Sequence, residues 1–63
     1  MENDYTKMEI AVAYSIINLK LRDYYSSFEE FCERENQKEI ELRKYLDSMG
    51  YYYNDDLNQL RKK

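Results

Sequence analysis

Residues 31–46 read FCERENQKEIELRKYL and have the spacing of two helices joined by a tight turn. Cys32 is a small residue that would let a second helix cross the first closely. Asn36 tolerates the left-handed backbone of a turn, and Leu42 would pack the second helix against the first. This spacing is typical of a helix-turn-helix, although it also occurs in three-helix domains that never bind DNA.

Three helices are predicted from apolar residues at helical spacing, over residues 8–25, 27–35 and 38–49. The second begins with a capping box, in which a serine is followed three residues later by an acid. Ser26 with Glu29 satisfies this pattern, and Ser27 with Glu30 satisfies it as well, so the choice of cap stays open. Gly50 is placed to close the third helix, because glycine adopts the left-handed conformation without strain.

After the third helix the apolar period changes from 3.6 residues to two, which indicates strands. Three tyrosines, the turn residues Asn54–Asp56 and a short return strand predict a β-hairpin over 51–60. A flexible N-terminus at 1–7 and a basic tail at 61–63 complete the chain. The expected fold class is therefore mainly α, a single domain of three helices in a helix-turn-helix-like arrangement with a C-terminal hairpin, as in winged helices.

Composition argues against most kinds of chemistry. The 63-residue chain has a formal net charge of −3, no histidine and one cysteine. Without histidine, the commonest general base and metal ligand is missing, and we expect a non-enzyme with no cofactor, metal or small-molecule substrate. Cys32 is expected to be a buried thiol, which fits a reducing, cytoplasmic location. The polar start MENDYTK does not resemble a signal peptide, and the apolar runs are too short to span a bilayer.

The predicted first helix carries two apolar stripes on roughly opposite sides. The first, expected to pack on the other helices, consists of Ile10, Ala13, Tyr14, Ile17, Leu21 and Tyr24. The second consists of Met8, Val12, Ile16 and Leu19. The second stripe needs cover from the hairpin, from a second copy of the chain or from another protein, and these alternatives stay open. Tyr52 and Leu57, expected to be exposed on the hairpin, complete a candidate protein interface.

DNA recognition is the alternative. The candidate DNA contacts are the lysine and arginine residues of the third helix and of the tail, namely Lys38, Arg43, Lys44, Arg61, Lys62 and Lys63. Residues 38–49 contain three positively charged and three negatively charged side chains, so this helix has no net charge. Each acid that faces a phosphate subtracts from the counterion release that drives DNA binding. We therefore expect a protein-interaction module, with homodimerisation through the first helix as one form of it, ahead of a winged helix-turn-helix regulator.

Two stretches, NLKLRDYYSSFEEFC (18–32) and LDSMGYYYNDDLNQL (46–60), resemble a small bacterial family, the domain-of-unknown-function family 4250. The resemblance rests on an Asn-x-Lys-Leu-Arg-Asp block, a Ser-Ser cap, a cysteine, and a Gly-Tyr-x-Tyr hairpin ending in Asn-Gln. These features fall on Asn18, Lys20, Leu21, Arg22, Asp23, Ser26, Ser27, Cys32, Gly50, Tyr51, Tyr53, Asn58 and Gln59.

The resemblance covers about residues 10–60 and implies the same fold. It implies no activity, because that family has no assigned role. The chain departs from the expected pattern at a few positions. Leu19, Tyr52 and Leu57 are apolar or aromatic where polar residues are expected, and Gln37 replaces an apolar turn residue.

Overall fold

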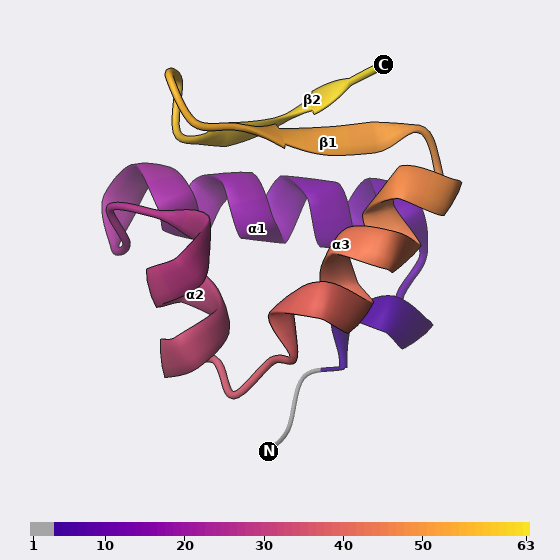
Figure 1. Ribbon diagram of the computed structural model, residues 1–63, viewed down its shortest axis with the longest axis horizontal. Helices are drawn as coiled ribbons and strands as arrows, with labels where there is room; N and C mark the ends of the chain where they lie inside the picture. Colours follow the sequence, from indigo (N-terminus) through magenta and orange to yellow (C-terminus); the bar gives the residue numbers. More distant parts are fainter. Residues whose placement is uncertain (1–3) are drawn as a thin grey trace.

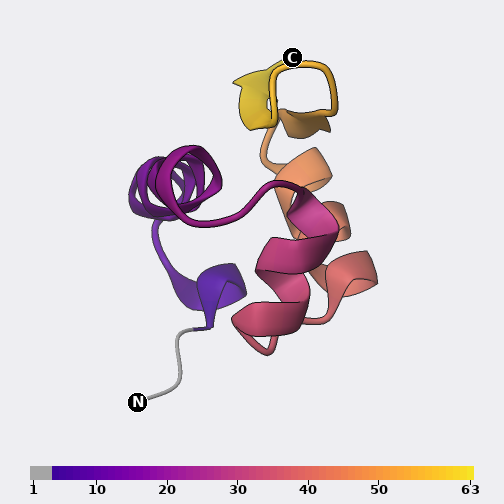
Figure 2. The same ribbon diagram turned by 90° about the vertical axis from the view of Figure 1, so that its left-hand side faces the viewer.

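The computed structural model describes residues 4–63 and shows three helices followed by an antiparallel hairpin, as predicted. The elements are η1 (Tyr5–Lys7), α1 (Ile10–Asp23), α2 (Phe28–Arg34), α3 (Glu39–Ser48), β1 (Tyr51–Asn54) and β2 (Gln59–Lys62). Figure 1 shows the hairpin along one side of α1, with α2 and α3 on the other side. In Figure 2, α1 is seen end-on beside a layer formed by α2 and α3 beneath the hairpin.

Every element except β1 contributes fully buried side chains to one core. The buried residues are Tyr5, Ala13, Ile17, Leu21, Phe28, Phe31, Cys32, Leu42, Leu46 and Leu60. The three from α1 lie four residues apart, which is the spacing of one helical stripe. Burial of each large apolar side chain contributes about 1.5–3 kcal/mol to folding, so this cluster is the main source of stability.

Local capping explains where the helices begin and end. Ser27 is the N-cap of α2, and its Oγ accepts a hydrogen bond from the Glu30 amide at 3.0 Å. The Glu30 carboxylate in turn accepts from the amide and the hydroxyl of Ser26, at 2.8 and 2.9 Å. Both serines therefore take part in one cap. Asn36 and Gly50 adopt positive φ, at 58° and 89°, and end α2 and α3 as predicted.

The first helix is shorter than the predicted 8–25. Tyr24, placed by the sequence on the inner stripe, leaves the helix with φ of −123° and is 71% exposed. Tyr25 turns back instead, with its ring 5.7 Å from that of Phe31. The helix ends here because the chain must reverse to start α2, and helical periodicity carries no signal for that reversal. The other two helices differ from the predicted ranges by one residue at each end.

The N-terminal segment also differs from the prediction, which took 1–7 to be flexible; residues 1–3 lie outside the described part of the chain. Asp4 caps η1 by accepting a hydrogen bond from the Thr6 amide at 3.1 Å. Tyr5 is fully buried, with its ring 5.3 Å from that of Phe31. A single aromatic residue in a polar segment has no periodicity, so only the folded core shows where it packs.

The hairpin extends two residues past its predicted end. In its register, Tyr51 lies opposite Lys62, Tyr52 opposite Arg61, Tyr53 opposite Leu60 and Asn54 opposite Gln59. Arg61 and Lys62, expected in a basic tail, are therefore strand residues. Their pairing uses backbone groups, which the charged side chains did not indicate.

Candidate interaction surface

The second stripe of the first helix is divided between the core and the solvent. Val12 and Leu19 are exposed on α1, at 47% and 46%. Met8 and Ile16 are half-buried and pack against the core. Met8 precedes α1, and its carbonyl accepts a hydrogen bond from the Tyr45 hydroxyl at 2.8 Å. The chain itself thus covers half of the predicted stripe and leaves the other half open.

Leu19 and Leu57 line one surface groove between α1 and the turn of the hairpin. Leu57 is 52% exposed, so both leucines present apolar surface to solvent. The rest of the lining is mainly polar and consists of Ser15, Asn18, Leu21, Arg22, Asn58 and Gln59. We call Val12, Leu19 and Leu57 the α1–turn surface. It combines a region of the first helix with the turn of the C-terminal hairpin, which lie far apart in the sequence.

Asn18 attaches the return strand to α1. Its Oδ1 accepts a hydrogen bond from the Leu60 amide at 2.6 Å, and its Nδ2 donates to the Leu60 carbonyl at 3.2 Å. A carboxamide that bonds both main-chain groups of one residue acts like a neighbouring strand. The position of β2 over α1, and hence the width of the groove, follows from this pair.

Asn58 attaches the turn to the end of α1. Its Nδ2 donates to the carbonyl of Leu21, in the last turn of α1, at 3.0 Å and to that of Tyr25, just beyond the helix, at 3.1 Å. The Leu21 carbonyl is one of the acceptors that a helix end leaves without a partner in the helix. The Oδ1 of Asn58 accepts from the Tyr53 hydroxyl at 2.6 Å. The residue holds φ at 51°, a conformation that asparagine tolerates. Leu57 is next to this anchor, which keeps it beside α1.

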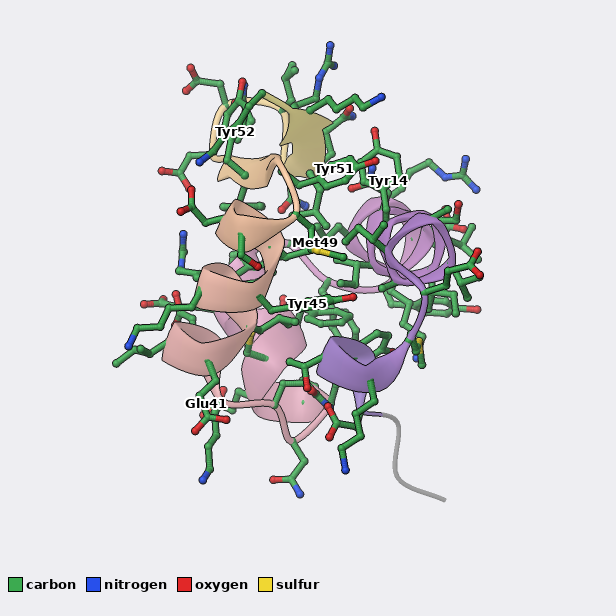
Figure 3. All side chains as sticks on the ribbon, turned by 90° about the vertical axis from the view of Figure 1, so that its right-hand side faces the viewer. Tyr14, Glu41, Tyr45, Met49, Tyr51 and Tyr52 are labelled. Carbon is green, nitrogen blue, oxygen red and sulfur yellow. The ribbon has the colours of Figure 1, made fainter. Side chains whose placement is uncertain are left out.

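Tyr52 does not join the α1–turn surface. It is exposed and lines a different groove, together with Arg43, Leu46 and Asp47 from α3. Figure 3 shows Tyr51 directed toward Tyr14 of α1, while Tyr52 points away from that helix. The Tyr14 and Tyr51 rings lie 4.7 Å apart. Strand alternation thus places neighbouring tyrosines on opposite faces of the hairpin.

Half of the candidate DNA contacts make ion pairs within the chain. Arg43 bonds Glu39 at 2.9 Å, and its guanidinium lies over the rings of Phe28 and Tyr53, at 4.9 and 5.7 Å. Lys38 lies 3.9 Å from Glu41. The last of the three pairs joins Lys63 to Asp47. Lys44, Arg61 and Lys62 remain exposed outside these pairs.

A family model described as "Domain of unknown function (DUF4250)" matches residues 7–60. The chain belongs to this family. No curated protein matches the chain, and no solved structure does. The family has no assigned function. Several residues that carry the family resemblance nevertheless have clear structural duties in this DUF4250 domain, since Asn18 and Asn58 anchor the hairpin, Ser27 caps α2 and Gly50 ends α3.

Lys20, another residue of the family pattern, belongs to a polar cluster that the sequence did not predict. One carboxylate, that of Glu35, accepts hydrogen bonds from the Tyr5 hydroxyl at 3.2 Å, from Lys20 Nζ at 2.9 Å and from the Tyr25 hydroxyl at 2.6 Å. Partial burial alone would raise the pKa of Glu35. The hydrogen bonds from Tyr25 and Lys20 outweigh burial, and the pKa of Glu35 is lowered. The cluster ties η1, α1 and the end of α2 together.

The thiol of the DUF4250 domain is unsuited to nucleophilic chemistry. Burial, together with the negative charge of Glu39, raises the pKa of Cys32 to about 12, so almost no thiolate exists at neutral pH. Within residues 4–63, no group of three histidine, cysteine or acidic side chains is arranged to hold a metal ion. In the same part of the chain, no helix has the length and apolar character needed to cross a membrane.

Proposed function

We propose that this DUF4250 domain is a non-catalytic protein-interaction module, and that a partner protein docks its apolar side chains on the α1–turn surface. The observation that carries the proposal is that Leu19 and Leu57 line the same groove while both stay about half exposed. Full burial of an exposed leucine contributes about 1.5–3 kcal/mol, so a partner that covers the exposed half of each side chain gains about half of that per leucine.

The surroundings of the groove support a role in binding for the exposed leucines. Asn18 and Asn58 hold its two walls by hydrogen bonds, so little ordering would remain for binding to impose. Arg22 and Asp23, an exposed ion pair at 3.0 Å, lie at the end of α1 beside it. An apolar centre with a charged border is the usual composition of a protein interface, in which the border favours one orientation of the partner.

Photocrosslinking in living cells tests this function. A benzophenone amino acid placed at Leu19 is expected to capture a partner, and Leu57→Asp in the same chain is expected to abolish that adduct. Ile40 provides the matched control, because it is exposed and apolar but belongs to α3. Benzophenone at Ile40 should give no such adduct, and Ile40→Asp should leave the adduct at Leu19 intact. An adduct that survives Leu57→Asp would remove the α1–turn surface from the proposal.

DNA binding is the second candidate, supported by one observation. Tyr52 and Arg61 lie opposite each other in the hairpin register, so an aromatic ring and a cation share the outer face of the hairpin. Fluorescence anisotropy of a labelled DNA duplex, titrated with the protein at several salt concentrations, tests whether the chain binds DNA. We expect no binding. Micromolar affinity that falls steeply with salt would replace the interaction proposal. A cytoplasmic setting, in which the buried thiol of Cys32 stays reduced, fits either candidate.

A further inference from the structure

Two hydrogen bonds show which backbone groups of each hairpin strand point away from the other strand. The Leu60 amide donates to Asn18 on α1 rather than to β1. The Lys63 amide donates to the Gly50 carbonyl at 2.9 Å. In an antiparallel pair, facing residues alternate between pairs that exchange both backbone bonds and pairs that exchange none. Gly50 and Lys63 thus form a bonded pair, whereas Tyr53 and Leu60 form a non-bonded pair.

It follows that Tyr51 and Tyr53 direct their amide and carbonyl groups away from β2. Within residues 4–63, no side chain and no backbone group outside the strand pair is hydrogen-bonded to the main chain of either tyrosine. The outer edge of β1 therefore presents two donors and two acceptors in a row. Such a row is a template for another extended strand.

The two edges of the hairpin are protected unequally. Natural edge strands are usually blocked by charged residues, by proline or by a covering element. The edge of β2 is covered at Leu60 by Asn18, and the strand carries Arg61 and Lys62. The strand β1 reads Tyr-Tyr-Tyr-Asn, with no charge and no proline. Arg43, Leu46 and Asp47 of α3 flank the β1 tyrosines, but no hydrogen bond from α3 reaches the main chain of Tyr51 or Tyr53. Of the two edges, β1 alone has neither a charged residue nor a hydrogen-bonded covering element.

The sequence of β1 favours a second copy of this chain as the strand that pairs with it. Tyr51–Tyr53 reads the same in both directions about Tyr52, so an antiparallel partner strand with the same sequence fits in register. Around a two-fold axis at Tyr52, each Tyr51 lies opposite Tyr53 of the second copy and exchanges both backbone bonds with it. The two Tyr52 rings then meet on the outer face as a cross-strand aromatic pair.

We propose that two copies of the chain pair through β1 into a four-stranded antiparallel sheet, in the order β2-β1-β1-β2, with Tyr52 on the two-fold axis. The assembly is closed, because its outer edges are the two β2 strands that α1 already covers at Leu60. This surface is separate from the α1–turn surface. Either proposal can fail without the other.

Charge substitution at Tyr52 provides the decisive test. Because Tyr52 is exposed, Tyr52→Lys and Tyr52→Glu leave the core untouched. Each variant alone places like charges directly opposite one another, and we expect its dimer dissociation constant in sedimentation equilibrium to rise about tenfold or more. An equimolar mixture of the two variants places opposite charges there and should restore dimerisation. Only an interface with Tyr52 on the two-fold axis predicts this recovery.

A crosslink locates the axis independently. Facing residues of a non-bonded pair have Cα atoms about 4.5 Å apart, which a disulfide can span. Tyr52→Cys should form an interchain disulfide with oxidised glutathione, whereas Ile40→Cys, the exposed control on α3, should not. Leu19→Asp should leave this crosslink unchanged, which separates the dimer from the proposed function. A wild-type chain that stays monomeric at about 1 mM, or a dimer indifferent to Tyr52→Lys, would overturn the proposal.

Discussion

Asn18 of α1 and Leu60 of β2 are joined by two hydrogen bonds across 42 residues of sequence. One short amide side chain thus occupies the place of a neighbouring strand and connects the first helix to the last strand. The same contact covers the β2 edge and leaves the β1 edge open. Together with Asn58, which attaches the turn to the end of α1, Asn18 holds the hairpin in position and with it both candidate surfaces.

Replacing Asn18 by alanine should lower the free energy of unfolding by about 2–3 kcal/mol, because the part-buried amide and carbonyl of Leu60 lose their partner. Urea denaturation measures the change. Asn54→Ala is the matched control, since Asn54 makes only an exposed hydrogen bond to the Leu57 amide, and it should cost less than about 1 kcal/mol. If the two variants lost the same free energy of unfolding, the hydrogen bonds of Asn18 to Leu60 would not be what holds β2 on α1.

Asn58 should be more sensitive to alanine than to glycine. Both substitutions remove the hydrogen bonds to Leu21 and Tyr25, but only alanine is also strained at the positive φ of this position. We expect Asn58→Ala to be less stable than Asn58→Gly by roughly 1 kcal/mol in the same denaturation experiment. Greater stability of the alanine variant would mean that the turn does not keep its left-handed backbone.

The carboxylate of Glu35 should make stability depend on pH in the acid range. Its pKa is lowered in the folded chain, so the folded state binds fewer protons there than the unfolded state. The stabilisation is therefore complete above the ordinary glutamate pKa of 4.5 and is lost as pH falls through the lowered value. Thermal melts of the wild type and of Glu35→Gln should differ at pH 7 and converge as the pH falls below 4.5. A difference in melting temperature that does not change with pH would exclude Glu35 as the source of the pH dependence.

Tyr5 should contribute mainly through its ring. Tyr5→Ala empties a fully buried position beside Phe31, and a loss of about 3–5 kcal/mol is expected for an aromatic side chain in a core. Tyr5→Phe removes only the hydroxyl bond to Glu35 and should cost about 1 kcal/mol. Guanidinium unfolding of the two variants measures both values. If Tyr5→Ala left the free energy of unfolding nearly unchanged, η1 would not be packed against the core in solution.

The helices and the hairpin could be predicted from the sequence because their signals are local. Ser27 caps α2 through the residue three positions on, and Asn36 and Gly50 end helices by their own backbone conformation. The alternation of Tyr51 to Tyr53 likewise placed Tyr52 outside. Such features depend on hydrogen bonds and dihedral angles within a few residues, so the order of the chain is enough to locate them.

The candidate surfaces could be predicted only in part. Val12, Leu19, Tyr52 and Leu57 are exposed as expected, but Met8 and Ile16 pack internally, and Tyr52 lies on another face. A helical wheel shows which residues share a side of a helix. It cannot show how far neighbouring elements reach around that side.

The sequence by itself determined the three helices, the hairpin, their order and the apolar or polar character of their faces, because these depend on neighbours along the chain. Only the tertiary structure decided that Tyr5 enters the core, that Leu57 lies in the groove with Leu19, and that β1 keeps an open edge. These outcomes rest on contacts between distant segments. Their energies depend on how three helices and a hairpin fill one small volume together, which no local pattern specifies.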